Sequence, residues 1–308
     1  MQNNSPINSA PDKNARLMRL ATYASVSVAI FLILVKLVAW SQSDSVSLLA
    51  TLIDSILDAF ASIINLFAVR HALTPADKEH RFGHGKAEAL AGLSQSLFIA
   101  GSAIFLLIEV GKNIIRPAQI NFPITSMIVV AVTILVTLML VGFQRYVIKK
   151  TQSVAISADA LHYKSDLLMN SAVILALWLS TVGLLIFDPI IGGIIAGYIL
   201  YSAWRILKSS MDQLMDRELP DDIRANIKKI VCNHDQVLGL HDLRTRHAGT
   251  ITFIQFHLEI DDDLTLFQAH NVSDEVETEL EKVYPQSEII IHIDPKSVVG
   301  KEAVATFE

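Results

Sequence analysis

The sequence of 308 residues contains a single cysteine, Cys232, and few charged residues. One cysteine cannot form an intrachain disulfide and leaves no thiolate cluster for a metal, so any metal site must use His, Asp and Glu. Only 18% of the residues are charged, whereas 52% are hydrophobic, and the mean hydropathy is +0.43. This composition is typical of a membrane protein.

The sequence also lacks a basic patch and a secretory signal. The formal net charge is -6 and the basic residues stand at the ends of apolar runs, so we exclude nucleic acid as a partner. The polar N-terminus has neither the basic-then-apolar start nor the small-residue cleavage site of a signal peptide. We therefore expect the first apolar segment to remain in the mature protein.

Six apolar runs are long enough to span a bilayer, which takes about 20 residues. They begin near Tyr23, Val46, Leu90, Ile124, Ser153 and Leu184. After about Ser209, charges become frequent and the apolar runs shorten. We predict an α-helical membrane protein, with six transmembrane helices in residues 1–208 and a small C-terminal domain in residues 209–308.

Basic residues predict the topology of these helices. They cluster before the first run, after the second, after the fourth and after the sixth, whereas the opposite connections hold only Lys112 and Arg116. By the positive-inside rule, both termini and the C-terminal domain are expected in the cytoplasm.

Four ionisable residues lie inside two of the apolar runs. Asp54 and Asp58 are four positions apart in the second run, and His162 and Asp166 are four apart in the fifth. Each pair therefore shares one helix face. A hydrogen bond between helices explains one such residue, but a buried aspartate costs about 3 kcal/mol on insertion scales, so two matched pairs indicate a functional site.

These two faces predict a metal site. If they meet, three carboxylates and one imidazole form a shell that suits tetrahedral zinc and tolerates cadmium, cobalt, iron(II) or manganese. Asp159 shares the face of His162 one turn earlier. We expect Asp159 to line a water-filled approach to the site, and simple surface solvation is the alternative.

The connection after the second run, "PADKEHRFGHGKAE", contains a second candidate site. Asp77, His80 and His84 are spaced by three and four, and Gly83 gives the backbone freedom to fold round an ion. From the residues alone, a metal site and a solvated loop with incidental histidines fit equally well.

The C-terminal region alternates helix and strand patterns. Residues 220–234 and 266–284 have helical periodicity, whereas residues 240–245, 251–260 and 288–294 read as strands. The order helix, strand, strand, helix, strand predicts a small α+β layer. With a period of two, His257 points away from Phe256, and His292 shares a face with Asp294.

Several histidines of this region could gather into a metal cluster. Taken singly, each histidine is explained better by a surface hydrogen bond than by a metal. The candidate ligands are His241, His257, His270, His292 and Asp294.

The combination of "DSILD", "HYKSD", "PADKEHRFGHGKAE" and "LHDLRTRHAG" resembles the cation diffusion facilitator family, in its bacterial ferrous-iron and zinc efflux branch. The resemblance implies a homodimeric zinc/proton antiporter of the bacterial inner membrane with a metallochaperone-like, ferredoxin-type C-terminal domain. It also implies roles for three sets of residues: the transport site at Asp54, Asp58, His162 and Asp166, a second zinc site at Asp77, His80 and His84, and a two-zinc centre at the dimer contact from the C-terminal candidates.

Our interpretation is therefore a proton-coupled exporter of Zn²⁺, with Fe²⁺ and Cd²⁺ as further candidate cargoes. The alternative is a membrane-anchored, non-transporting zinc sensor or scaffold, but an anchor needs no ligands buried in the membrane. A zinc enzyme is disfavoured, because four protein ligands leave no open position for a reactive water.

Overall fold

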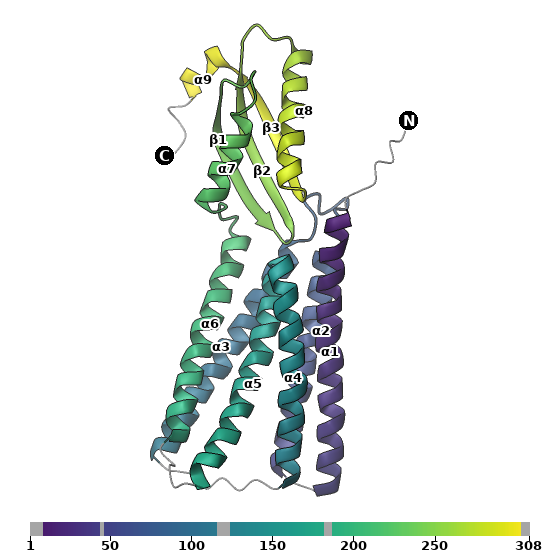
Figure 1. The fold of residues 1–308 in the computed structure, drawn as a ribbon, viewed down its shortest axis with the longest axis vertical. Helices are drawn as coiled ribbons and strands as arrows, with labels where there is room; N and C mark the ends of the chain where they lie inside the picture. The colour runs from purple at the N-terminus through teal and green to yellow at the C-terminus, as the bar shows by residue number, and fades with distance from the viewer. Residues whose placement is uncertain (1–8, 44–45, 116–123, 182–186, 303–308) are drawn as a thin grey trace. The chain divides into compact units, whose positions relative to one another are not determined.

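The computed structural model describes residues 9–43, 46–115, 124–181 and 187–302. The chain forms two compact units, a helical unit of Asp12–Met211 and a second unit that contains Asp212–Glu308 (Figure 1). The predicted start of the sixth run at Leu184 and the basic residue Arg116 lie outside the described residues.

The helical unit is made of long helices. Their bounds are α1 (Ser9–Ser43), α2 (Val46–Ala72), α3 (Lys86–Ile115), α4 (Ile124–Thr151), α5 (Val154–Thr181) and α6 (Phe187–Leu214). The shortest, α2, has 27 residues. At 1.5 Å per residue it is about 40 Å long, which exceeds the hydrocarbon core of a bilayer.

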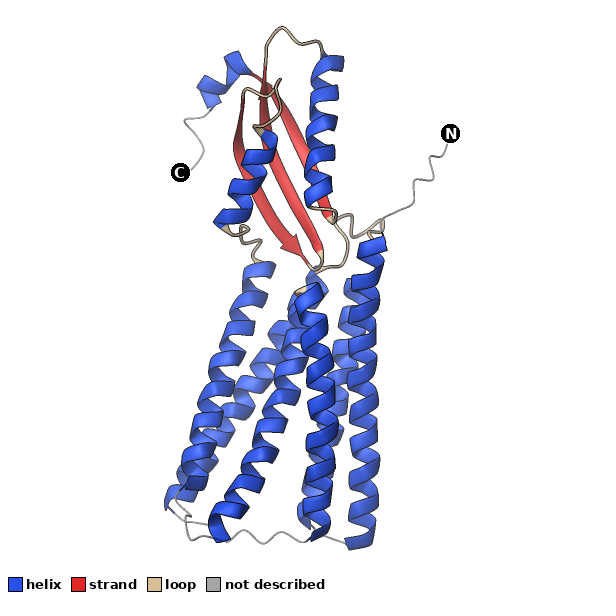
Figure 2. Cartoon of the chain, viewed as in Figure 1, coloured by secondary structure: helices blue, strands red, loops and turns tan. Residues whose placement is uncertain are grey.

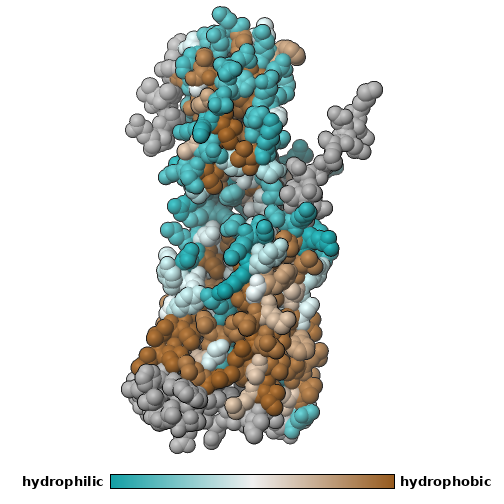
Figure 3. Space-filling view, in the orientation of Figure 1, coloured by the Kyte–Doolittle hydropathy of each residue, from teal (hydrophilic) through white to brown (hydrophobic). Residues whose placement is uncertain are grey.

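Five of these helices, all but α5, are long and apolar enough to cross a membrane. The helix α5 is as long as α4 and α6, at 28 residues, but its first half carries Asp159, Lys164 and Asp166. Large apolar side chains are exposed on the helices, for example Phe105 at 66% and Ile194 at 68%. On the face shown in Figure 3, hydrophobic residues gather over these helices, as expected for contact with lipid.

Packing within the helical unit places α5 between its neighbours. The helix contacts α2, α3 and α4, and Leu161 of α5 packs with Ile99 of α3 and Ile199 of α6 (Figure 1). Gly92 of α3 permits a close approach of this helix to α5 and α6, because a Cβ atom there would lie 2.8 Å from Ser210 Oγ and from Val154 Cγ1. The side chains of α5 are therefore surrounded by other helices over its first turns.

The second unit contains a three-stranded sheet with two helices over one of its faces (Figure 2). Its elements are α7 (Asp221–Val231), β1 (Gly239–Ala248), β2 (Ile251–Ile260), α8 (Leu266–Val283), β3 (Ser287–Pro295) and α9 (Lys296–Glu302). The strands pair in the order β1-β2-β3, β1 antiparallel to β2 and β2 parallel to β3. The crossover from β2 through α8 to β3 is a βαβ unit.

Alternation along β2 separates the core of this unit from its other face. Ile254, Phe256 and Leu258 are at most 1% exposed and pack against α7 and α8. The intervening His257 points to the opposite face, which neither α7 nor α8 covers. The predicted order of helices and strands is confirmed, and the short α9 is an addition that the sequence pattern did not predict.

We predict that Phe256→Ala weakens the second unit by about 3–5 kcal/mol, because the substitution leaves a cavity in the core. Phe267→Ala is the matched control, since Phe267 is 73% exposed. Hydrogen exchange in the full chain should show faster exchange of the β1, β2 and β3 amides in the Phe256 variant only. Equal exchange in both variants would contradict the assigned core.

Candidate metal sites

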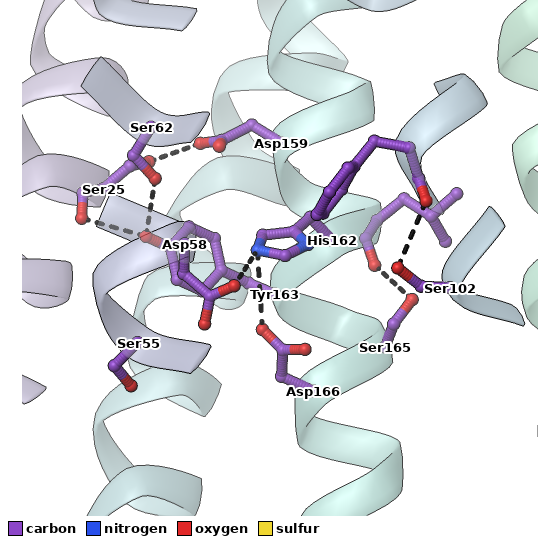
Figure 4. A network of polar contacts seen from close by, with 12 residues as sticks. Ser25, Ser55, Asp58, Ser62, Ser102, Asp159, His162, Tyr163, Ser165 and Asp166 are labelled. Atoms are coloured by element: carbon purple, nitrogen blue, oxygen red, sulfur yellow. Dashed lines mark hydrogen bonds and ion pairs between the residues drawn. The ribbon is translucent and has the colours of Figure 1, made fainter. Parts of the chain in front are cut away.

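Helices α2 and α5 bring three of the four predicted intramembrane residues together. One ligand atom each from Asp58, His162 and Asp166 lies within 4.8 Å of the others. The imidazole of His162 lies between the two carboxylates (Figure 4), with Nε2 3.0 Å from Asp58 Oδ1 and 3.8 Å from Asp166 Oδ2. Among the described residues, this buried Nε2 has no partner in hydrogen-bonding geometry. A buried imidazole nitrogen that faces two carboxylate oxygens at these distances fits a bound cation.

The fourth predicted residue, Asp54, lies beside this group and not within it. Asp54 is one turn before Asp58 on α2 and lines the same cavity of about 160 Å³ as Asp58 and Asp166. A water molecule occupies about 30 Å³ in the liquid, so the cavity has room for an ion and part of its hydration shell. The side chain of Asp54 is exposed to this space, within reach of an ion held by its neighbour one turn away.

Lys36 of α1, which is not among the predicted site residues, lines the same cavity. Its ammonium donates hydrogen bonds to Ser55 Oγ at 2.6 Å and to the carbonyl oxygen of Thr51 at 3.1 Å. The sequence does show Lys36 as an isolated charge inside the first apolar run. A charge inside a membrane helix is energetically costly and usually functional. Lys36 places a fixed positive charge beside the carboxylates of the site.

The prediction that Asp159 lines a water-filled approach is wrong. Asp159 is fully buried, and its carboxylate accepts hydrogen bonds from three uncharged side chains. The donors are Ser25 Oγ at 2.5 Å, Gln144 Nε2 at 2.7 Å and Gln95 Nε2 at 3.4 Å. They belong to α1, α4 and α3. Asp159 therefore connects these three helices to α5 through hydrogen bonds and does not contact the expected water-filled approach.

Tyr163 extends this network next to His162. Its hydroxyl donates to the carbonyl oxygen of Ser25 at 3.1 Å and lies 2.8 Å from Ser62 Oγ on α2. Tyr163 is 2% exposed. The turn of α5 that carries His162 is thereby fixed to α1 and α2, which restricts the orientation of the candidate ligands.

The connection between α2 and α3 brings Asp77, His80 and His84 within 4.8 Å of one another. Gly83 has a φ of 75°, a conformation that glycine adopts without strain. The backbone N–H of His80 donates to Asp77 Oδ1 at 2.6 Å and, with that of Glu79, holds the pKa of Asp77 below its usual value. The carboxylate of Asp77 is therefore ionised at neutral pH, as a metal ligand requires.

The surroundings of His84 also suit a metal ligand. Its Nδ1 is 3.3 Å from the carbonyl oxygen of Thr74, to which it can donate, while Nε2 lies 3.3 Å from Asp77 Oδ2. This tautomer directs the lone pair of Nε2 at the candidate site. His71, which the sequence analysis does not assign to a site, packs its ring against His84 at 4.5 Å between ring centroids.

Three histidines form a row across the sheet. His241 of β1 pairs in register with His257 of β2, which pairs with His292 of β3. The ring centroids are 4.9 Å and 4.6 Å apart along the row. His241, His257 and Asp294 offer ligand atoms within 4.8 Å of one another. A bulge between His241 and Arg244 interrupts the register next to this row.

Asp294 is the common partner of the row. Its carboxylate lies 2.7 Å from His257 Nδ1, 3.1 Å from His292 Nε2 and 3.4 Å from His241 Nε2. Asp294 is 7% exposed, whereas the side chain of His292 is 65% exposed. The row therefore has a half-buried end at His241 and His257 and an open end at His292.

Glu259 holds His241 from the other side. Its Oε1 is 3.1 Å from His241 Nδ1, and Lys296 donates to its other oxygen. The hydrogen bond from Lys296 is the main reason that the pKa of Glu259 lies below its usual value. Gly239 makes this placement possible, because a Cβ atom there would lie 2.6 Å from Glu259 Oε2.

The structure of one chain does not bring His270 into the row. His270 lies on α8, 3.5 Å from Asp274 on the same helix, with its side chain 64% exposed. Because α8 covers the opposite face of the sheet, a role for His270 in the same cluster requires more than the single chain.

Two family models match the sequence. The model for the cation efflux transmembrane domain matches residues 22–215, and the model for the cytoplasmic domain of cation efflux proteins matches residues 219–296. Among curated proteins, the cation-efflux pump FieF of Pectobacterium carotovorum is 48% identical over 285 residues, 92% of this chain and 95% of the relative. FieF of Escherichia fergusonii is 48% identical over 287 residues, 93% of this chain and 96% of the relative.

Among solved structures, one described as a zinc form of the zinc transporter CzrB is 32% identical to this chain. The match covers 27% of this chain and 94% of that chain, with a TM-score of 0.26.

We predict that His241→Ala removes about one zinc ion per chain, because His241 supplies one of three converging ligands. His247→Ala is the matched control on the same strand, since the ring of His247 contacts Thr252 and lies outside the row. Elemental analysis after equilibration with zinc should separate the two variants. The same zinc content in both would exclude the row as a zinc site.

We predict that Lys36→Met strengthens zinc binding at the membrane site by about tenfold, because it removes a positive charge that repels the ion. Lys36→Arg keeps the charge and should bind zinc as the wild type does. Competition with a chelating dye measures the zinc affinity of both variants. The chains also carry His80→Ala and His241→Ala, which disable the candidate metal groups of the loop and the sheet. Weaker or unchanged binding in Lys36→Met would show that the charge does not act on the site.

Proposed function

Because the chain belongs to the cation diffusion facilitator family of divalent metal cation efflux transporters, we propose that it exports Zn²⁺ from the cytoplasm in exchange for protons. The family is one of transporters and not of enzymes, and the chain is a multi-pass membrane protein. The observation that carries the proposal is the group of Asp58, His162 and Asp166 among apolar helices, in which His162 is buried and the two half-buried aspartates line a cavity.

The donor set supports zinc as the cargo. One imidazole nitrogen with two or three carboxylate oxygens suits a borderline ion that accepts tetrahedral coordination. Asp54 supplies the further oxygen when an ion occupies the cavity that it shares with Asp58. Fe²⁺ and Cd²⁺ are secondary cargoes, because such a site follows the general order of metal affinities more than it discriminates.

Proton exchange follows from the chemistry of the same residues. A histidine binds a metal only through a free lone pair, and a carboxylate binds one only when it is ionised, so protons and a metal ion compete for the same ligand atoms. Release of the ion on the side of lower pH is favoured when protons replace it on the imidazole and the carboxylates. The next ion from the cytoplasm displaces those protons.

The other two groups have supporting roles in this proposal. Residues 1–208 form the transport domain, and residues 209–308 form a cytoplasmic zinc-binding domain through which two chains pair as a homodimer. Zinc at the row of His241, His257 and His292 with Asp294 stabilises that domain, and His270 joins from the dimer contact. The loop site of Asp77, His80 and His84 exchanges ions with the cytoplasm, because Asp77 and His80 are exposed.

We predict that Asp58→Ala abolishes zinc flux in proteoliposomes with an imposed pH gradient, because it removes the carboxylate nearest His162 Nε2. Glu109→Ala is the control, since this acidic residue of α3 pairs with Lys112 at the surface and should leave flux unchanged. Wild-type flux in Asp58→Ala would show that Asp58, His162 and Asp166 do not form the transport site. Zinc flux through the wild type that ignores the pH gradient would instead identify a uniporter and exclude proton exchange.

A further inference from the structure

A basic pocket of about 580 Å³ lies between α4, α5 and α6, apart from the three metal sites. Arg145, Lys164 and Arg205 line it, one from each helix, and none of the described residues that line it is acidic. The side chains of Arg145 and Arg205 are exposed, and the ammonium of Lys164 donates to the hydroxyl of Tyr198. Three positive charges without a carboxylate repel a divalent cation, so this pocket suits an anion.

Exposed aromatic residues lie close in sequence to the two arginines of this pocket on α4 and α6. Tyr146 follows Arg145 on α4 and is 53% exposed, and Tyr201 and Trp204 of α6 are 62% and 61% exposed. Tyrosine and tryptophan concentrate at the headgroup level of a bilayer, where their rings bridge water and hydrocarbon. Their positions beside Arg145 and Arg205 therefore place the pocket at the membrane surface.

The sequence around the pocket indicates the cytoplasmic leaflet. Lys149 and Lys150 stand in the last turn of α4, and the segment that matches a cytoplasmic domain begins at residue 219, shortly after α6 ends at Leu214. This step rests on the proposed orientation of the chain. The cytoplasmic leaflet is the negatively charged one, and basic pockets between transmembrane helices on that side bind lipid headgroups.

The lining also provides for the apolar part of a lipid. Val141, Ile148, Leu161 and Ile206 line the pocket beside its three cations, together with the hydroxyl groups of Ser157 and Ser202. A phosphodiester can accept hydrogen bonds from guanidinium and hydroxyl groups while its first methylenes contact the apolar side chains. Free phosphate would use the cations but leave the apolar lining without a partner.

We propose that this pocket binds the phosphate of an anionic phospholipid from the cytoplasmic leaflet. Arg145 and Arg205 hold the phosphodiester, and Lys164 with Tyr198 closes the polar end of the site. Leu161 lines the pocket and directly precedes the candidate ligand His162 on α5. The lipid therefore binds next to the transport site without contacting the metal ligands.

Native mass spectrometry of the full chain, released from vesicles of mixed phosphatidylglycerol and phosphatidylcholine, tests the proposal. The wild type should retain phosphatidylglycerol preferentially. Arg145→Gln with Arg205→Gln should lower the retained phosphatidylglycerol roughly tenfold or more. Lys149→Gln with Lys150→Gln removes the same charge from exposed positions outside the pocket and should retain the lipid as the wild type does.

Three outcomes would overturn the proposal. The first is wild-type retention in the arginine variant, and the second is an equal loss in the lysine control, which would indicate general charge attraction. The third is displacement of phosphatidylglycerol from the wild type by inorganic phosphate at equal concentration, which would make free phosphate the ligand. Arg145→Lys with Arg205→Lys keeps the charge and should restore retention, which separates lost binding from misfolding.

Discussion

The burial of carboxylates among apolar helices is the constraint on which the helical unit depends. Each buried charge needs a partner, because no water in the hydrocarbon region can solvate it. Asp58 and Asp166 face the imidazole of His162, and Asp159 is held by three uncharged donors from three other helices. The hydrogen bonds to Asp159 and the close approach of Asp58 to His162 also hold α5 against its neighbours, so the site and the bundle are stabilised together.

The three candidate metal groups use similar ligands in different surroundings. In the membrane group the residues around the ligands are a lysine, a tyrosine and a buried aspartate, and the cavity is small. In the loop the backbone orients Asp77 and His84. In the sheet the strand register aligns the histidines, and Glu259 with Lys296 supports one end. Rigid neighbours, as in the sheet, suit a structural metal site, whereas exposed ligands, as in the loop, permit exchange of the metal ion.

Helix and strand periods predicted the parts of these sites that lie on one element. A spacing of four placed His162 and Asp166 on one face of α5, and a spacing of two placed His257 opposite Phe256. Contacts between distant elements could not be predicted in this way. The three donors to Asp159 are uncharged and stand on three other helices. The row from His241 to His292 depends on strand register and on a bulge.

The most direct test of the account is the coordination of zinc in the membrane group. X-ray absorption spectroscopy should be measured on zinc-loaded full-length chains in which His80→Ala and His241→Ala disable the other two groups. We expect one imidazole nitrogen and three carboxylate oxygens at about 2.0 Å from the zinc. Two or more imidazoles, or an oxygen-only shell, would contradict a site built from Asp54, Asp58, His162 and Asp166.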